Sequence, residues 1–539
     1  MSIRSDQPPI DQGTSDQESG HSASKRFGFS HTDESAALAS PSFPAETLAA
    51  SVAALLAMTV LQRAIGLARG VLFCRWLEPA ELGQWDLAFG FLMLAAPLTV
   101  LGLTGSYGRY LEHYRRRGHV RSFVRRTATC VALLAAAAAI TLAAGRGWFA
   151  EAIFAHPHGQ GLLLATAAAL IVVIAFNALF ELFGGLRWFR VAVAMQFFHS
   201  LIFAALGIVL AFLWEPTALS LVVAFGGAYA LCALGAMPWV VRAWKSLPVG
   251  EPLRQSAMWS RVVPFAASVW LINAIANLFD LVDRWMLVHY SGMDAAAALA
   301  AVGNYHAART LTLPLLAVAA LFRSALLPHL THDWEAGRRQ AVELRLSNVL
   351  KLWGLTLMVV STGLGLAGPA LFDLAFRGKY TAGLHVLPWT AMYLSWASLA
   401  ALATTYAWCA ERPGLSSIPL AAGLAANIGL NLLWLPRLGL FGAVSSTAAA
   451  NLLALCLAYA VNGRLGAKPT RGVWAVSLAP LALIGGAPLA VAVTAALLHQ
   501  AYARQWLLTP QEKERLKQYL LLGLSRLKFE RLAQRPAAG

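Results

Sequence analysis

Six of the ionisable side chains inside long apolar stretches of the sequence are our candidates for a functional site, and their types and spacing limit the chemistry that the chain could perform. They are Arg63, Arg69, Asp280, Asp283, Arg284 and Arg309. A charged side chain at the centre of a membrane helix costs about 2.5–3.5 kcal/mol on insertion scales. Such side chains therefore line polar cavities or pair with one another. They predict either a translocation pathway or a set of buried ion pairs.

The spacing around Asp280 predicts specific pairs. Asp280 and Arg284 are four residues apart, so they can pair within one helix, whereas Asp283 points elsewhere. At a rise of 1.5 Å per residue, Asp283 lies about 10 Å and Arg309 about 9 Å inside their apolar stretches. If the two helices are antiparallel neighbours, Arg309 and Asp283 lie at one level. They would then form either a stabilising ion pair or a gate.

Arg63 and Arg69 lie in the first apolar stretch. Arg63 is about 24 Å from the start of that stretch, too deep to reach the interface easily. We expect it to line a cavity, with a buried structural pair as the alternative. Six residues rotate a helix by about 600°, so Arg69 does not share its face. Arg323 lies near the end of its own stretch and is expected to reach the membrane surface.

The composition is that of a membrane protein. The chain has 539 residues, of which 58% are hydrophobic and 13% charged, whereas soluble proteins carry about 25% charged residues. The mean hydropathy is +0.59. The five cysteines form no CxxC pair, so the sequence predicts no zinc site, no disulfide framework and no cofactor.

Apolar stretches long enough to cross a bilayer predict an all-α polytopic membrane protein with 12–14 transmembrane helices, since a spanning helix needs about 20 residues. The candidate spans are 47–73, 84–107, 127–145, 162–183, 191–213, 217–240, 262–289, 303–328, 349–375, 385–409, 416–435, 440–462 and 473–499.

The distribution of Lys and Arg predicts a cytoplasmic amino terminus. With that orientation the inside segments carry 24 basic residues and the outside loops carry 5. This bias accounts for most of the net charge of +16 without any nucleic-acid partner. The carboxyl-terminal segment 501–539 holds eight basic residues, although thirteen crossings would leave it outside. Because Gly485, Gly486 and Pro488 interrupt the last stretch, either it is a re-entrant hairpin or the span count is wrong by one.

A faint internal repeat predicts two pseudo-symmetric six-helix lobes. Gly83-Gln84-Trp85-Asp86 and Gly303-Asn304-Tyr305-His306 each open an even-numbered span, with six spans between them. The predicted segments are a disordered cytoplasmic tail (1–45), an N-lobe (46–245), a C-lobe (246–465), one or more additional membrane segments (466–500) and a basic amphipathic cytoplasmic tail (501–539).

Three stretches resemble the polysaccharide flippase branch of the multidrug/oligosaccharidyl-lipid/polysaccharide exporter superfamily. Residues 75–85 (RWLEPAELGQW) look like the family's joint between helices one and two. Residues 279–287 (FDLVDRWML) are similar to its helix-seven element, followed by a helix-eight stretch from Gly303 to Pro328. Residues 427–451, with Asn431, Leu435-Pro436, Gly439 and Gly442, are similar to its turn between helices eleven and twelve.

The resemblance implies a flippase and not an enzyme. Such proteins move an undecaprenyl-pyrophosphate-linked oligosaccharide across the cytoplasmic (inner) membrane by alternating access, for lipopolysaccharide or exopolysaccharide biosynthesis. The implied partners are the lipid-linked oligosaccharide, membrane lipids, and a polysaccharide polymerase and glycosyltransferases. The diphosphate would need a cationic cavity, for which Arg63, Arg69, Arg284 and Arg309 are the candidates. Asp280 and Asp283 would act in a gate or in ion pairs.

Other functions remain open. A cation- or proton-coupled drug antiporter and a peptidoglycan lipid flippase belong to the same superfamily. An antiporter for cationic drugs would favour buried carboxylates, whereas the arginines here outnumber the acids. A membrane oligosaccharide polymerase or ligase would need a sizeable outside loop, and the short loops argue against one.

Overall fold

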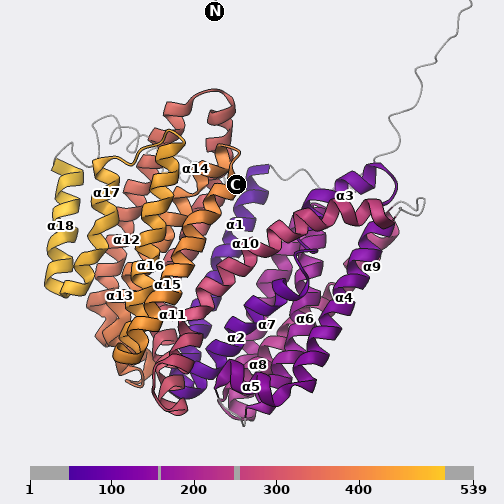
Figure 1. Ribbon diagram of the computed structural model, residues 1–539, viewed down its shortest axis with the longest axis horizontal. Helices are drawn as coiled ribbons and strands as arrows, with labels where there is room; N and C mark the ends of the chain where they lie inside the picture. The colour runs from indigo at the N-terminus through magenta and orange to yellow at the C-terminus, as the bar shows by residue number, and fades with distance from the viewer. Residues whose placement is uncertain (1–47, 156–158, 248–254, 504–539) are drawn as a thin grey trace, which may run out of the picture. The chain divides into compact units, whose positions relative to one another are not determined.

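The computed structural model describes residues 48–155, 159–247 and 255–503, and those residues form helices without any strand. The residues from Ala54 onward make up one unit, and the helices described below belong to it. The predicted tails 1–45 and 501–539 lie outside the described residues, apart from 501–503. Figure 1 shows the helices running side by side, as expected for a membrane bundle.

The elements, in chain order, are α1 (Leu48–Trp76), α2 (Pro79–Thr99), α3 (Ser106–Arg116), α4 (Val120–Ala144), α5 (Arg146–Phe154), α6 (Gln160–Gly185), α7 (Phe189–Leu213), α8 (Ala218–Gly235), α9 (Met237–Ser246), α10 (Gln255–Tyr290), α11 (Ala295–Glu335), α12 (Arg339–Phe376), α13 (Thr381–Ala403), α14 (Thr405–Cys409), the 3₁₀ turn η1 (Pro413–Ser416), α15 (Ser417–Leu438), α16 (Leu440–Arg464), α17 (Arg471–Leu478), the 3₁₀ turn η2 (Ala479–Gly485) and α18 (Ala487–Ala503).

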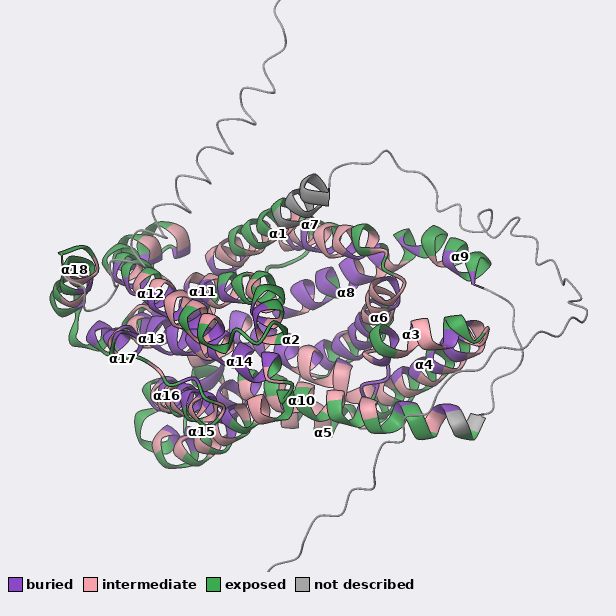
Figure 2. Cartoon of the chain, turned by 90° about the horizontal axis from the view of Figure 1, so that it is seen from above, coloured by how far each residue is buried: buried purple, intermediate pink, exposed green. Residues whose placement is uncertain are grey.

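Eleven helices in the described part of the chain are long and apolar enough to cross a membrane. The predicted all-α membrane fold is therefore confirmed. α2, with 21 residues, is not among the eleven but has the length to span. Figure 2 shows that the helices are buried to different extents. In the apolar segment of α13, 72% of the residues are buried, whereas in that of α1 only 11% are buried.

Two predicted spans differ from the observed helices. The span expected at 84–107 is α2 over 79–99, because Pro79 opens that helix and the chain turns at Leu101 and Gly102, which both have positive φ. The span expected at 217–240 is divided between α8 and α9, and Pro238 lies in the first turn of α9. α3 and α9 are short helices that follow a span.

Three helices are longer than the predicted spans. α10, α11 and α12 have 36, 41 and 38 residues. At 1.5 Å per residue, α11 is about 61 Å long, roughly twice the thickness of a bilayer core. Polar residues at its end do not break the helix, so hydropathy marks only its membrane-embedded part.

The last predicted span, 473–499, is divided into two short pieces. α17 with η2 covers 471–485 and α18 covers 487–503, and Gly486 between them has φ of 90°. Both pieces pack on α12: Ser347 meets Thr470 at 3.4 Å, and Thr362 meets Thr494 at 2.8 Å. The chain therefore runs part of the way along α12 and returns, which is the hairpin that Gly485 and Gly486 indicated.

We call the end of the helices that holds the α1–α2, α10–α11 and α12–α13 junctions the tight end. Lys379 Nζ lies 2.7 Å from Glu78 Oε1, and the Tyr380 hydroxyl donates to the Leu77 carbonyl at 2.9 Å. A Cβ on Gly303 would overlap the Pro79 carbonyl oxygen. Segments far apart in sequence therefore meet here backbone to backbone.

The contacts between α2 and α11 are reciprocal. A Cβ on Gly83 would overlap the Leu299 carbonyl, just as one on Gly303 would overlap that of Pro79. Each glycine thus meets the residue four positions before the other. A local twofold axis would give this pattern. The symmetry of two whole six-helix lobes stays a prediction.

We call the opposite end, with the α3–α4, α6–α7, α11–α12 and α16–α17 junctions, the basic end. It holds the segments 108–126, 184–190, 241–247, 255–261, 329–351 and 463–472, which belong to the regions that the sequence predicts to be inside. Thr470 and Ser347 meet here, and Arg261 Nη1 lies 2.9 Å from His113 Nε2. The basic loops thus gather at one end of the bundle.

Candidate functional site

A cluster of charged side chains lies where α2, α10 and α11 meet. Its ionisable members are Asp86, Asp280, Asp283, Arg284, His306 and Arg309. α2 packs on both α10 and α11, so a residue in the second helix of the chain comes into contact with residues some 200 positions later. We call this set the charge cluster.

Arg284 is the centre of the charge cluster. Its residue is 1% exposed, yet it is charged at any physiological pH. Its guanidinium lies 2.8 Å from Asp86 and 2.9 Å from Asp280, with Asp283 at 3.6 Å. Three carboxylates from two helices thus compensate one fully buried cation. Removing a partner from such an arrangement is far more destabilising than its formation is stabilising.

Arg309 pairs with Asp280 at 2.5 Å and not with Asp283. The i, i+4 pair expected between Asp280 and Arg284 is present. Asp283, which was expected to lie at the depth of Arg309 and pair with it, is about one helical turn beyond Asp280. Asp283 instead accepts hydrogen bonds from the Tyr305 hydroxyl at 2.8 Å and the Thr447 hydroxyl at 3.1 Å. The side chain of Asp283 points toward α16. The depth of a residue within an apolar stretch does not predict this direction, because the direction depends on the rotation of the helix.

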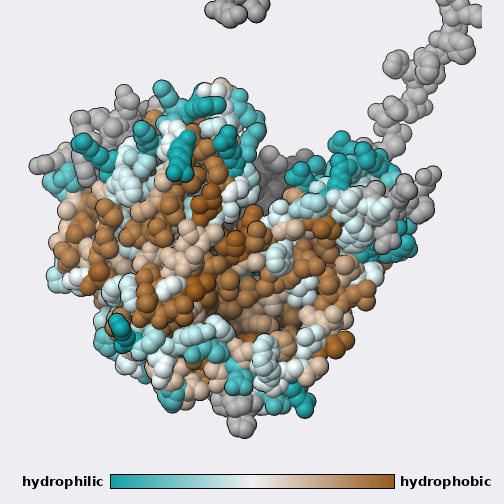
Figure 3. Space-filling model, in the orientation of Figure 1, coloured by the Kyte–Doolittle hydropathy of each residue, from teal (hydrophilic) through white to brown (hydrophobic). Residues whose placement is uncertain are grey.

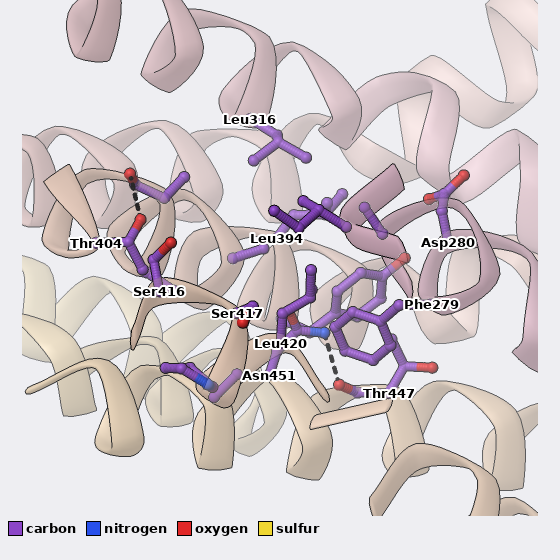
Figure 4. A pocket seen from close by; sticks show the side chains of 18 of the residues that line it. Phe279, Asp280, Leu316, Leu394, Thr404, Ser416, Ser417, Leu420, Thr447 and Asn451 are labelled. Carbon is purple, nitrogen blue, oxygen red and sulfur yellow. Dashed lines mark hydrogen bonds between the residues drawn. The ribbon is translucent and has the colours of Figure 1, made fainter. Parts of the chain in front are cut away.

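A cavity of about 470 Å³ begins at the charge cluster. Its wall includes Asp280 and Asp283 at one end and Thr404, Ser416 and Ser417 at the other, as Figure 4 shows for the residues that it labels. α10, α11, α13, α15 and α16 form the rest, mainly with apolar side chains. Thr404 and Ser416 lie next to α14, whose Cys409 Sγ is 3.8 Å from Thr331 Oγ1, close to the α11–α12 junction. The cavity therefore extends toward the basic end.

The charges in this cavity balance. Asp280, Asp283, Arg309 and Arg323 line it, two of each sign. The Asp280 side chain is 60% exposed, whereas that of Arg309 is 8% exposed. Asp280 is therefore the member of this pair that an incoming solute would meet first. Arg309 becomes available to an anion only if Asp280 moves aside.

Two of the expected cavity arginines lie outside the charge cluster and do not line the cavity of about 470 Å³, so their role at a substrate site stays a prediction. Arg63 is exposed on α1, outside the charge cluster. Arg69 is half-buried, with its guanidinium 4.2 Å from the ring centre of Phe203 on α7. Its neighbourhood is aromatic, because Phe203 also packs against Phe225. The structure therefore brings together Arg284, Arg309, Asp280 and Asp283 but neither Arg63 nor Arg69.

Sequence reasoning missed five members of the site. Asp86 and His306 occupy the fourth position of the two repeat segments, and they contact each other with His306 Nδ1 2.7 Å from Asp86 Oδ1. Tyr305, Tyr393 and Thr447 connect Asp283 to α11, α13 and α16. The repeat was the available signal for Asp86 and His306. Nothing in local spacing indicated Tyr393 or Thr447.

Few other groups could perform chemistry. In the described ranges no three His, Cys, Asp or Glu side chains gather in a way that could hold a metal ion. On the amphipathic helix α3, burial and the nearby cations Arg117 and Arg261 lower the pKa of His113. The lowered pKa favours the neutral imidazole, so the positive charge of α3 comes from its arginines.

Comparisons with known proteins agree with this geometry. The family model described as "Polysaccharide biosynthesis protein" matches residues 48–332. A solved structure of the lipid II flippase MurJ in an inward closed conformation superposes with a TM-score of 0.65 at 12% identity, covering 84% of this chain and 99% of that one. An inward-facing MATE-family multidrug resistance transporter of the MOP superfamily superposes with a TM-score of 0.57 at 11% identity, covering 78% of this chain and 98% of that one. An outward-facing MATE transporter superposes with a TM-score of 0.53 at 13% identity, covering 78% of this chain and 96% of that one. No protein of curated function matches the chain.

Proposed function

This chain belongs to the polysaccharide biosynthesis protein family, within the multidrug/oligosaccharidyl-lipid/polysaccharide exporter superfamily, and from that premise we propose that it flips a lipid-linked oligosaccharide across the cytoplasmic membrane. Family and fold are those of membrane transporters rather than catalysts. The proposed substrate is an undecaprenyl-pyrophosphate-linked oligosaccharide for surface polysaccharide. The family match over residues 48–332 carries this proposal.

The cavity suits one half of an alternating-access cycle. It extends toward the basic end, while Lys379–Glu78 and the glycine contacts join the helices at the tight end. We propose that the basic end is cytoplasmic, because all the segments predicted to be inside carry 24 basic residues in total, whereas the outside loops carry 5. The cavity would then receive the substrate head group from the inside. Separation at the tight end would release it outside.

Arg309 is our candidate for the diphosphate contact. A phosphate oxygen that replaced the Asp280 carboxylate would keep the buried guanidinium paired during the exchange. The freed Asp280 would still have Arg284 at 2.9 Å. Substrate binding would thus be coupled to a new arrangement of charges between α10 and α11. This exchange gives the substrate a means of biasing one conformation over the other.

Two other substrates compete with this proposal. The cavity holds as many carboxylates as arginines, which would also suit a cation-coupled drug antiporter. The fold is equally compatible with a peptidoglycan lipid flippase. A membrane polymerase or ligase is the alternative from another class. Direct assay of each substrate distinguishes these functions.

The test is flipping in proteoliposomes of a fluorescent undecaprenyl-pyrophosphate oligosaccharide, followed by loss of protection from a membrane-impermeant quencher. We expect wild-type protein to flip it, and Arg309→Gln to be slower by about tenfold or more, because one charge-assisted hydrogen bond is worth about 1.5–3 kcal/mol. Arg437→Gln, an exposed arginine at the tight end, is the matched control and should behave as wild type.

The outcomes separate the site from the function. Normal flipping by a folded Arg309→Gln variant would remove Arg309 from the diphosphate site and leave the function standing. If wild-type protein left the oligosaccharide lipid unflipped but flipped lipid II, or exported a cationic dye against a proton gradient, the proposed substrate would be wrong.

A further inference from the structure

A second cavity, of about 300 Å³, lies between α4, α6 and α9, away from the charge cluster. Leu179, Leu182 and Leu186 of α6 form one wall, and Ala128 of α4 and Trp244 of α9 form others. Arg125 is the one charged residue of its described lining. We call this the α9 groove. It has the apolar surface that suits a hydrocarbon chain and a single cation.

α9 places this groove at the level of lipid head groups. Met237, Trp239, Val241 and Trp244 are exposed on this ten-residue helix, which also carries Arg242 and Lys245. Short helices with exposed tryptophan and a basic face lie in the membrane interface. Figure 2 shows α9 beside α6, with α3 and α4 on the same side of the structure.

The cations at the groove have unused hydrogen-bonding capacity. Arg121 lies one turn before Arg125 on the same face of α4, and its Nη2 donates to the Trp244 carbonyl at 2.9 Å. Its guanidinium also lies 5.5 Å from the Trp244 ring. Nε of Arg121 is buried without a hydrogen-bond partner in the described structure. Buried donors of this kind are normally satisfied, which points to an external acceptor.

The surrounding charge is strongly positive. Segments 106–130, 182–190 and 236–247 contain eleven Lys or Arg and one acid, Glu112. Glu112 pairs with Arg116, away from the groove. In Figure 3 hydrophilic residues gather at the upper right, where Figure 1 places α3 and α9. A zwitterionic head group would leave this field uncompensated, whereas an anionic one would compensate it.

We propose that the α9 groove binds an anionic glycerophospholipid of the bilayer. Its phosphate lies on Arg121 and Arg125, and one acyl chain lies along Leu179 and Leu182. The site is separate from the translocation cavity and does not depend on which solute that cavity moves. Its occupant would fix α9 to α4 and α6 at the basic end.

Native mass spectrometry of the full-length protein, titrated in detergent with phosphatidylglycerol or phosphatidylcholine, tests the proposal. Wild-type protein is expected to retain phosphatidylglycerol in preference to phosphatidylcholine. The double variant Arg121→Gln/Arg125→Gln should bind phosphatidylglycerol about 25-fold more weakly, at roughly fivefold per cation. Arg115→Gln/Arg117→Gln removes the same charge from exposed positions in the last turn of α3 and just after it and is the matched control.

A second variant keeps all the arginines. Ala128→Leu fills the groove from an exposed position on α4, and it should weaken phosphatidylglycerol binding without changing the charge. Glycerol phosphate, which has the head group but no acyl chain, should not compete. Equal losses from the two double variants, or unchanged binding by Ala128→Leu, would show that only nonspecific surface charge holds the lipid. Competition by glycerol phosphate would show a phosphate site and refute a lipid site.

Discussion

Replacing Arg284 by methionine should destabilise the protein by about 3 kcal/mol, near the lower end of the range for breaking a buried ion pair. The loss is limited because each carboxylate retains other partners. Asp280 keeps Arg309, and Asp283 keeps the hydroxyls of Tyr305 and Thr447. Asp86 is the least compensated of the three carboxylates. His306 is then the remaining partner of its Oδ1, and its Oδ2 has no partner in the described structure.

A double-mutant cycle with Asp86→Asn isolates this contact. The second substitution removes the carboxylate that Arg284→Met leaves uncompensated, so it should recover about 1–2 kcal/mol. The assay is reversible unfolding by sodium dodecyl sulfate of purified protein in mixed micelles, followed by helical circular dichroism. Additive losses in the double variant, or a single-variant loss under about 1 kcal/mol, would refute the buried bridge between α2 and α10.

Three further predictions follow from the contacts at the two ends. Gly303→Ala should destabilise the protein by about 1–3 kcal/mol in the same unfolding assay, because the added methyl group meets the Pro79 carbonyl, whereas Gly363→Ala, with open space at its Cβ, should not. In a cysteine-free background, Ser416→Cys should react with an impermeant thiol reagent from the cytoplasmic side and Arg437→Cys from the opposite side; labelling of both from one side would contradict the proposed orientation. Glu78→Cys/Lys379→Cys joined by a short bifunctional thiol reagent should stop flipping reversibly, and continued flipping would exclude separation of the tight end.

The helices could be predicted from the sequence because each apolar stretch carries its own signal. Gly485 and Gly486 also indicated the final hairpin, and the eight basic residues beyond it pointed the same way. Hydropathy missed the polar extensions of α10, α11 and α12, since a helix continues past the membrane wherever nothing breaks it. Hydropathy also missed the break between α8 and α9, because the two helices are separated by a single residue and the apolar stretch continues across it.

The candidate site was only partly predictable. Asp280 and Arg284 could be paired because they share one helix. The contact between Asp86 and His306 joins residues 220 positions apart, and only the crossing of α2 and α11 brings them together. The neighbours of Arg69 could not be predicted either: the rotation of α1 turns this side chain toward Phe203, and rotation depends on packing partners that the sequence alone does not identify.

The length of α11 has a mechanical consequence. The helix is held against α2 at Gly303 and continues for 32 residues to Glu335, about 48 Å at 1.5 Å per residue. It therefore acts as a lever with its pivot near one end. A tilt of about 10° at the glycine crossing would carry Glu335 through roughly 8 Å, on that same rise per residue. If α11 moves as one rigid body through Pro314 and Pro328, a small change of packing at Gly83 and Gly303 would be magnified along its length into a much larger displacement at the far end.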